Sequence, residues 1–355
     1  MKSELFIQPD DGSERMIQAI GDARKSIDVA IFRFDHKLIE KALVEAIRRS
    51  VTVRALIAFT NRGGESRLRG LESRLLAAGA AVARTADDLT RYHGKFMIID
   101  SKRLFVLGFN FTRADMEQSR SFGLMTTSAE LVQEAEKLFN ADSTRQSYTS
   151  GLDALPVSPV NARRSLSEFL KGAGKELLIY DLEISDRAIL QVLKGRAAAG
   201  VEVRVIGAVK PAPSGVEVRR SHPLRLHARV IVRDRSSLFV GSQSLRRIEL
   251  DSRREVGVIF QDRGKAQAIA KEFERDWVSS ESDHMATRKI AKKVAKAMAG
   301  DLASVGAVLE QMEAKSGHEI DVNRESLDQI VQDAVKTAVR DAVFEAVNAA
   351  AVTKD

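Results

Sequence analysis

Two stretches of the chain place a histidine and a cation at the same spacing. One runs from Tyr92 to Asp100 and the other from Leu226 to Asp234; in each, the cation follows the histidine by two residues and an aspartate follows the cation by five. An imidazole can attack phosphorus or protonate a leaving group, and a fixed cation can neutralise the non-bridging oxygens of a phosphodiester. A single pair of this kind is usually a surface pair, but that interpretation does not explain why the same residues recur at equal spacing in two copies. The candidate residues are His93, Lys95 and Asp100 in the first copy and His227, Arg229 and Asp234 in the second.

Each stretch is predicted to form the first strand of a β-hairpin. Side chains alternate between the faces of a strand, so the histidine and the cation project from the same face. A polar turn and a returning apolar run follow in both copies, and the two aspartates are expected to support these turns. Pairing residue 99 with 104 brings Asn110 beside His93, and the same register, 233 with 238, brings Ser244 beside His227. Asn110 and Ser244 are therefore predicted to donate hydrogen bonds to the phosphate.

The elements around the two hairpins repeat in the same order. Short apolar runs alternate with segments of helical periodicity in both parts of the chain, and a turn-rich linker lies at 150–156. This order predicts an α/β fold in which two similar half-domains, residues 1–148 and 157–280, pack as one duplicated unit. Residues 211–223 are expected to form an exposed loop, and residues 285–355 a helical tail.

The two motifs, H-x-K-x4-D at His93 and H-x-R-x4-D at His227, resemble the duplicated HxKxxxxD signature of the phospholipase D superfamily. The resemblance spans about residues 4 to 277. It implies a metal-independent phosphodiesterase without a cofactor, in which a covalent phosphohistidine forms on one histidine while the other acts as general acid and then as base. By resemblance His93 is the nucleophile.

Several positions depart from the family pattern. Arg229 stands for lysine, Ser244 for asparagine, and Leu107-Gly108 for Gly-Ser. A glutamate generally follows in each half; Glu255 matches it in the second, whereas Ser121 stands there in the first. If Glu255 holds His227 in its reactive tautomer, the roles of the two histidines are reversed.

Composition restricts the class of protein. The 355 residues are 44% hydrophobic and include no cysteine, which indicates a globular protein without disulfides or thiolate metal sites. No metal site, signal peptide or membrane span is predicted, and a cytoplasmic location is expected. The formal net charge of +7 favours anionic partners, either nucleic acid or an acidic lipid surface contacted peripherally.

Three functions follow from these observations. The first is hydrolysis or headgroup exchange on a phospholipid, as the resemblance implies. The second is a nuclease, because arginines precede both hairpins and could track a phosphate backbone. The third is a non-catalytic binding or scaffold protein, in which the departures from the family pattern record lost activity. The arginines in question are Arg62, Arg67, Arg69, Arg91, Arg219, Arg220 and Arg225.

The tail and the remaining histidines are assigned other roles. An apolar stripe at helical spacing runs from Leu327 to Val347 and predicts self-association through the C-terminal helices. A basic cluster from Arg288 to Lys296 is either a solvated face or an anion-binding patch. His36, which lacks a neighbouring motif, is expected at the surface.

Overall fold

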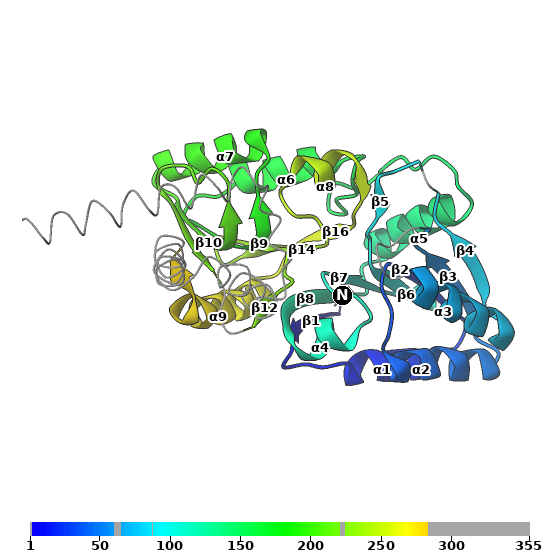
Figure 1. Cartoon of the computed structure of the whole chain (residues 1–355). Coiled ribbons are helices and arrows are strands. Elements are labelled where there is room, and N and C mark those ends of the chain that lie inside the picture. Colours follow the sequence, from blue (N-terminus) through cyan, green and yellow to red (C-terminus); the bar gives the residue numbers. More distant parts are fainter. Residues whose placement is uncertain (1, 60–64, 87, 221–223, 283–355) are drawn as a thin grey trace, which may run out of the picture. The chain divides into compact units, whose positions relative to one another are not determined.

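The computed structural model describes residues 2–59, 65–86, 88–220 and 224–282. The chain forms two compact units, Met1–Ser280 and Glu281–Asp355, and both predicted halves lie in the first (Figure 1). The predictions for the tail, its apolar stripe and its basic cluster fall outside the described residues. The division into 1–148, 157–280 and 285–355 stays a prediction. Among the described residues, no helix combines the length and apolar character that crossing a membrane requires.

Two sheets with the same strand order form the first unit. Six strands of each sheet correspond, and each central strand is flanked by a parallel and an antiparallel neighbour. The first sheet has the order β1 (Ser3–Gln8), β8 (Ser119–Thr126), β7 (Arg103–Leu107), β6 (Phe96–Ile99), β2 (Ser26–Ile31), β3 (Thr52–Ile57) and β4 (Ala81–Arg84). The second has, within this unit, the order β16 (Gly257–Gln261), β14 (Ser237–Gly241), β13 (Val230–Arg233), β9 (Glu176–Ile184), β10 (Glu202–Val209) and β11 (Val216–Arg220). The predicted duplicated α/β fold is confirmed.

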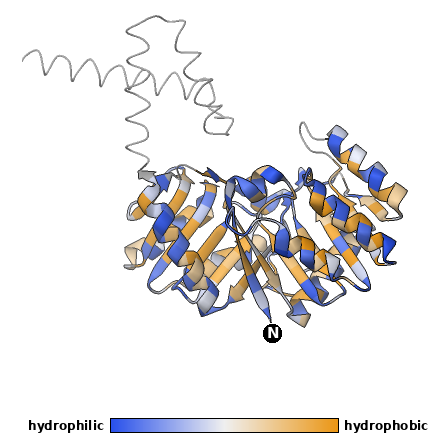
Figure 2. Ribbon diagram, turned by 90° about the horizontal axis from the view of Figure 1, so that it is seen from below, coloured by the Kyte–Doolittle hydropathy of each residue, from blue (hydrophilic) through white to orange (hydrophobic). Residues whose placement is uncertain are grey.

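Helices cover both sheets, and apolar strands lie between more polar helices (Figure 2). One apolar cluster joins the first sheet to α1 (Glu14–Gly21), α2 (Lys37–Arg48) and α3 (Glu65–Ala78). A second joins the other sheet to α6 (Ala162–Lys171) and α7 (Arg187–Ala198). The third includes residues of both sheets, α5 (Ala129–Ser143) and α9 (Arg263–Ser279). Because this cluster is shared, the two halves are packed on each other through a common core; the rings of Phe122 and Tyr180, for example, lie 5.1 Å apart.

Both hairpins differ from the predicted register by one residue. Ile99 pairs with Arg103, and Arg233 pairs with Ser237, so three residues rather than four form each turn. Asp100 and Asp234 begin these turns with φ of 56° and 52°. Their carboxylates accept backbone N–H groups at distances down to 2.6 Å from Lys25 and 2.7 Å from Lys175. Aspartate adopts the left-handed conformation more readily than most residues, and these bonds hold the shortened turn in place. The alternation of side chains does not reveal either feature.

Two other predictions of local structure are wrong. Part of the expected loop at 211–223 forms β11, which pairs in parallel with β10. Residues 216–219 of this strand are partly or fully exposed, so its sequence lacks the apolar run of a buried central strand. His36 is buried rather than exposed, and it occupies the N-cap position of α2.

Candidate active site

The strand before each histidine pairs with the other half of the chain. β5 (Arg91–Tyr92) runs parallel to β15 (Arg253–Arg254), and β12 (Arg225–Leu226) runs parallel to the start of β8. The backbone N–H of His93 donates to the carbonyl oxygen of Arg254 at 2.7 Å, and that of His227 donates to Arg120 at 2.9 Å. These crossed pairings bring both histidines to the junction of the two halves.

The two arginines that receive these bonds are anchored by equivalent contacts. Arg254 donates to Asp142 of α5 at 3.0 Å, and Arg120 donates to Asp276 of α9 at 2.7 Å. All four residues are at least nine-tenths buried. Breaking a buried ion pair by removing one partner typically costs about 3–5 kcal/mol, so these contacts hold the strands on which the histidines lie.

His93 is held by a carboxylate of the second half. Oε2 of Glu255 lies 2.7 Å from Nδ1 of His93, and both side chains are buried. Burial, together with the charge of Lys95, holds the pKa of His93 well below its usual range. Burial, with the nearby charge of Glu249, raises the pKa of Glu255 to about 8. When Glu255 is ionised, the ring proton of a neutral His93 lies on Nδ1, and Nε2 keeps a lone pair.

His227 faces a carboxylate of the first half. Nδ1 lies 3.2 Å from Oδ2 of Asp115, close enough for an ion pair although the two groups do not align as a hydrogen bond. Burial would raise the pKa of Asp115, but the charges of His227 and Arg225 and the bonds from Asn110 outweigh it, and this pKa is lowered. Burial lowers the pKa of His227 well below its usual range, and Asp115 opposes this shift. Asp115 is thus ionised beside the imidazole.

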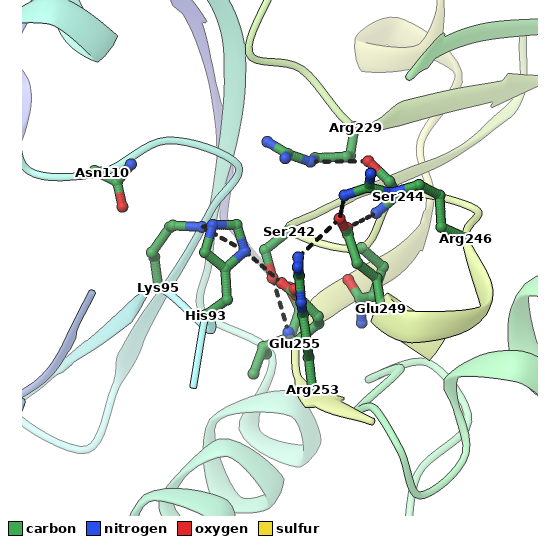
Figure 3. Close-up of polar contacts among 12 residues, drawn as sticks. His93, Lys95, Asn110, Arg229, Ser242, Ser244, Arg246, Glu249, Arg253 and Glu255 are labelled. Atoms are coloured by element: carbon green, nitrogen blue, oxygen red, sulfur yellow. Dashed lines mark hydrogen bonds and ion pairs between the residues drawn. The ribbon is translucent and has the colours of Figure 1, made fainter. Parts of the chain in front are cut away.

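The two cations come from different halves of the chain, Lys95 beside His93 and Arg229 beside Ser244 (Figure 3). The ammonium of Lys95 is fully buried, 2.9 Å from Nε2 and 3.1 Å from Nδ1 of His93, and burial lowers its pKa to about 7. One ammonium cannot donate along both lone-pair directions, so this contact is mainly electrostatic. Nε of Arg229 donates to Oγ of Ser244 at 3.3 Å, whereas Nη1 is buried without a hydrogen-bond partner. A phosphate oxygen could satisfy that group.

Asn110 does not contact His93 as the predicted register implied. Its backbone N–H and its side-chain amide donate to Oδ2 of Asp115 at 2.8 and 2.7 Å. The backbone N–H of Leu107, and not that of residue 108, donates to Lys95, so the observed register does not pair Asn110 with His93. Asn110 lies beyond the end of β7. Ser244 is bonded to Arg229 and not to His227. Asn110 thus holds Asp115, which lies beside His227, and Ser244 accepts a hydrogen bond from Arg229.

The expectation that Glu255 would orient His227 is also wrong. Glu255 follows Arg254, and the β5–β15 pairing directs it to His93. Corresponding residues of the two halves differ by 134 positions, as in 93 and 227 or 121 and 255. By this correspondence Ser121 takes the place beside His227, but its hydroxyl donates to the carbonyl oxygen of Asp115 at 3.3 Å.

Asp115 was missed by the sequence analysis. It lies on α4 (Arg113–Glu117), a five-residue helix whose N-cap, Thr112, accepts from the N–H of Asp115. Glu249 is its counterpart on α8 (Arg247–Asp251) at the same offset. A carboxylate at matching positions of both halves was a signal that the sequence already contained.

The site thus combines two histidines with opposed carboxylates and two buried cations. An imidazole can attack phosphorus or exchange a proton with a leaving group, and buried cations can neutralise phosphate oxygens. Within the described part of the chain, no group of three or more His, Asp and Glu side chains is placed to hold a metal ion.

Several solved structures are similar to the chain, and two of them share its fold. A polyphosphate kinase from Porphyromonas gingivalis superposes with a TM-score of 0.64 at 18% identity over 77% of this chain and 50% of the kinase, so the chain spans about half of that protein. A phosphatidylserine synthase from Haemophilus influenzae Rd KW20 gives a TM-score of 0.59 at 11% identity over 79% of this chain and 87% of the synthase. Nuc, a phospholipase D family member from Salmonella typhimurium, gives 0.37 at 21% identity over 41% of this chain and 96% of Nuc. No curated protein matches the chain.

The family is given by the sequence match. The family described as cardiolipin synthase, PLD-like domain, matches residues 16–143 and 207–277, which together exceed half of the chain. The matched ranges include the candidate residues of both halves, and the resemblance inferred from the motifs is confirmed. The chain belongs to the phospholipase D superfamily, in the PLD-like domain family named for cardiolipin synthase.

Proposed function

We propose that the protein is a phosphodiester-cleaving or phosphodiester-exchanging enzyme that acts through a covalent intermediate on His93. The observation that carries the proposal is the contact between His93 and Glu255, next to the two buried cations. The reversed assignment depended on Glu255 holding His227. Because Glu255 lies on His93, the family resemblance and the orienting carboxylate support the same nucleophile.

The proposed reaction has two steps. The lone pair on Nε2 of His93 forms a bond to phosphorus while the bond to the leaving oxygen breaks, and His227 donates a proton to that oxygen. His227 then removes a proton from water or an alcohol, which attacks phosphorus and displaces His93. Lys95 and Arg229 neutralise the non-bridging oxygens in both steps. A bound phosphodiester adds negative charge beside His227, and this raises its pKa toward the value a general acid needs.

Phospholipid is the leading substrate class. The name of the matching family and the fold shared with phosphatidylserine synthase support this choice. Three of the seven arginines that favoured a nuclease are engaged within the protein: Arg69 pairs with Glu72, Arg219 lies over Trp277, and Arg225 pairs with Asp115. Nucleic acid is kept as the alternative substrate. Peripheral membrane contact and self-association through residues 285–355 accompany the proposal as predictions.

One set of assays tests the proposal. The protein is incubated in EDTA with an aryl phosphodiester, with vesicles of phosphatidylcholine or phosphatidylglycerol, and with single- and double-stranded DNA. We expect release or exchange of a lipid headgroup, and a phosphohistidine on His93 that accumulates in His227→Asn and is absent in His93→Asn. Degraded DNA with intact lipids would favour the nuclease. Turnover that persists in His93→Asn, or no turnover of any diester by the folded protein, would contradict the proposed mechanism.

A further inference from the structure

The two histidines lie beside carboxylates at positions that do not correspond. Glu255 orients His93, and its counterpart by the 134-residue offset is Ser121, which cannot supply a charge. Asp115 faces His227 instead, and its own counterpart is Glu249. The symmetry of the fold is therefore broken at the point where the chemistry of the two histidines must differ.

Asp115 is held rigidly toward His227. Oδ2 accepts two bonds from Asn110, at 2.8 and 2.7 Å, and lies 3.2 Å from Nδ1 of His227. Oδ1 pairs with Arg225, the residue two positions before His227. Asp115 is 3% exposed, so these contacts act in a poorly screened environment. Asn110 thereby contributes to the site through Asp115.

Glu249 keeps one of these contacts and differs in the others. Its Oε2 accepts from the backbone N–H of Ser244 at 2.6 Å, as Asp115 accepts from Asn110. Its other oxygen pairs with Arg246 and Arg253, and Figure 3 shows it on the side of these arginines. The serine at 244 also offers no side-chain amide to the carboxylate. These contacts of Glu249 are therefore all with residues of its own half, and none is with His93.

Resting on the proposed function, we propose that Asp115 replaces the carboxylate missing at Ser121 and acts as the positioning residue of the general acid, His227. Asp115 holds the proton of a neutral His227 on Nδ1 and stabilises the imidazolium that donates from Nε2. The lowered pKa of Asp115 supports this role, because an ionised carboxylate is required. Arg225 also pairs with this carboxylate and so limits how strongly Asp115 stabilises the imidazolium, which allows His227 to release its proton.

The inference predicts a dependence on the leaving group. Asp115→Asn should lower the rate of intermediate formation, measured in the first turnover, roughly 10²-fold or more for an alkyl leaving group, which needs a proton, and less than about 10-fold for 4-nitrophenolate, which does not. Adding Ser121→Glu should recover at least about 10-fold of the alkyl rate, because residue 121 is placed as Glu255 is placed for His93. Glu117→Gln, which removes an exposed carboxylate of the same helix, is the matched control and should leave both rates within about 2-fold. Equal losses for both leaving groups, or no recovery in the folded double variant, would overturn the inference.

A second measurement does not depend on turnover. Nitrogen NMR of the histidine rings should show the Nδ1–H tautomer of His227 in the wild-type protein and its loss in Asp115→Asn, with recovery on adding Ser121→Glu. Arg225→Gln retains Asp115 and should raise the pKa of His227, which gives a test if Asp115→Asn fails to fold. Unchanged His227 signals in these folded variants would overturn the inference whatever the activity. A responsive His227 in a protein that turns over no diester would leave the inference standing and reject the proposed function.

Discussion

Replacing Glu255 by glutamine should slow the formation of the covalent intermediate on His93. The carboxylate lies 2.7 Å from Nδ1, and both groups are buried. Glutamine preserves the size of the side chain, but it lacks the charge that keeps the ring proton on Nδ1 and the lone pair on Nε2. The variant should therefore contain a smaller fraction of the nucleophilic tautomer.

The magnitude follows from the kind of bond that is lost. A hydrogen bond to a charged group contributes about 1.5–3 kcal/mol, and about 1.4 kcal/mol corresponds to a factor of ten in rate. We therefore expect the burst rate to fall about 10- to 150-fold. The pKa of Glu255 is raised to about 8, and the nucleophilic form needs the ionised carboxylate. Ionisation of Glu255 should thus raise the wild-type burst rate as the pH rises through about 8, whereas loss of the proton of Lys95, whose pKa is lowered to about 7, opposes this rise. The glutamine variant should lose the rising contribution and keep only the decrease that Lys95 causes.

Stopped-flow measurement of 4-nitrophenolate release from an aryl diester, from pH 6 to about 9, tests both expectations. Asp251→Asn on α8 serves as the control, because it removes a partly exposed carboxylate that pairs with Arg163 in the same half. A burst rate within about threefold of the wild type at pH 8, in a variant that unfolds at the same denaturant concentration, would refute the role of Glu255. If His227→Asn abolished the burst at the same time, His227 would be the nucleophile.

Three further predictions concern stability and assembly. Arg254→Met should lower the free energy of unfolding, measured in urea titrations, by about 3–5 kcal/mol because it leaves buried Asp142 unpaired. The control Arg164→Met, at an exposed ion pair, should lower it by less than about 1 kcal/mol. Similar small losses in both variants would contradict the anchoring role of Arg254. Burial would raise the pKa of Asp100, but the hydrogen bonds from three backbone N–H groups outweigh burial, and this pKa is lowered. The ionised carboxylate therefore stabilises the fold at pH values above its unfolded pKa, which is near 4, and this stabilisation is lost as the pH falls through the lower folded pKa. Asp100→Asn should accordingly unfold with a weaker dependence on acid pH, and an unchanged acid dependence would argue against the turn role. Removal of residues 281–355 should lower the number of chains per particle, as measured by light scattering, if the apolar stripe mediates self-association, and an unchanged oligomeric state would reject that prediction.

The sequence determined the features that depend on neighbours along the chain. Alternation of polar and apolar residues located both hairpins, and the matching positions of His93 and His227 identified the duplication and the chemistry. The family resemblance then gave the duplicated α/β fold that the structure and the sequence match confirm. These features were predictable because a strand side chain faces one side or the other according to its local position.

Tertiary structure decided which groups face each histidine. Glu255 and His93 are 162 residues apart, and their contact exists because β5 pairs with β15 across the halves. No local periodicity encodes that pairing; it follows from packing both sheets, α5 and α9 around one apolar core. The matching pairing of β12 with β8 brings His227 beside Asp115, where a serine at 121 stands in place of the usual glutamate. The residue types were readable from the sequence, but their partners depended on how the two halves bury their shared surface.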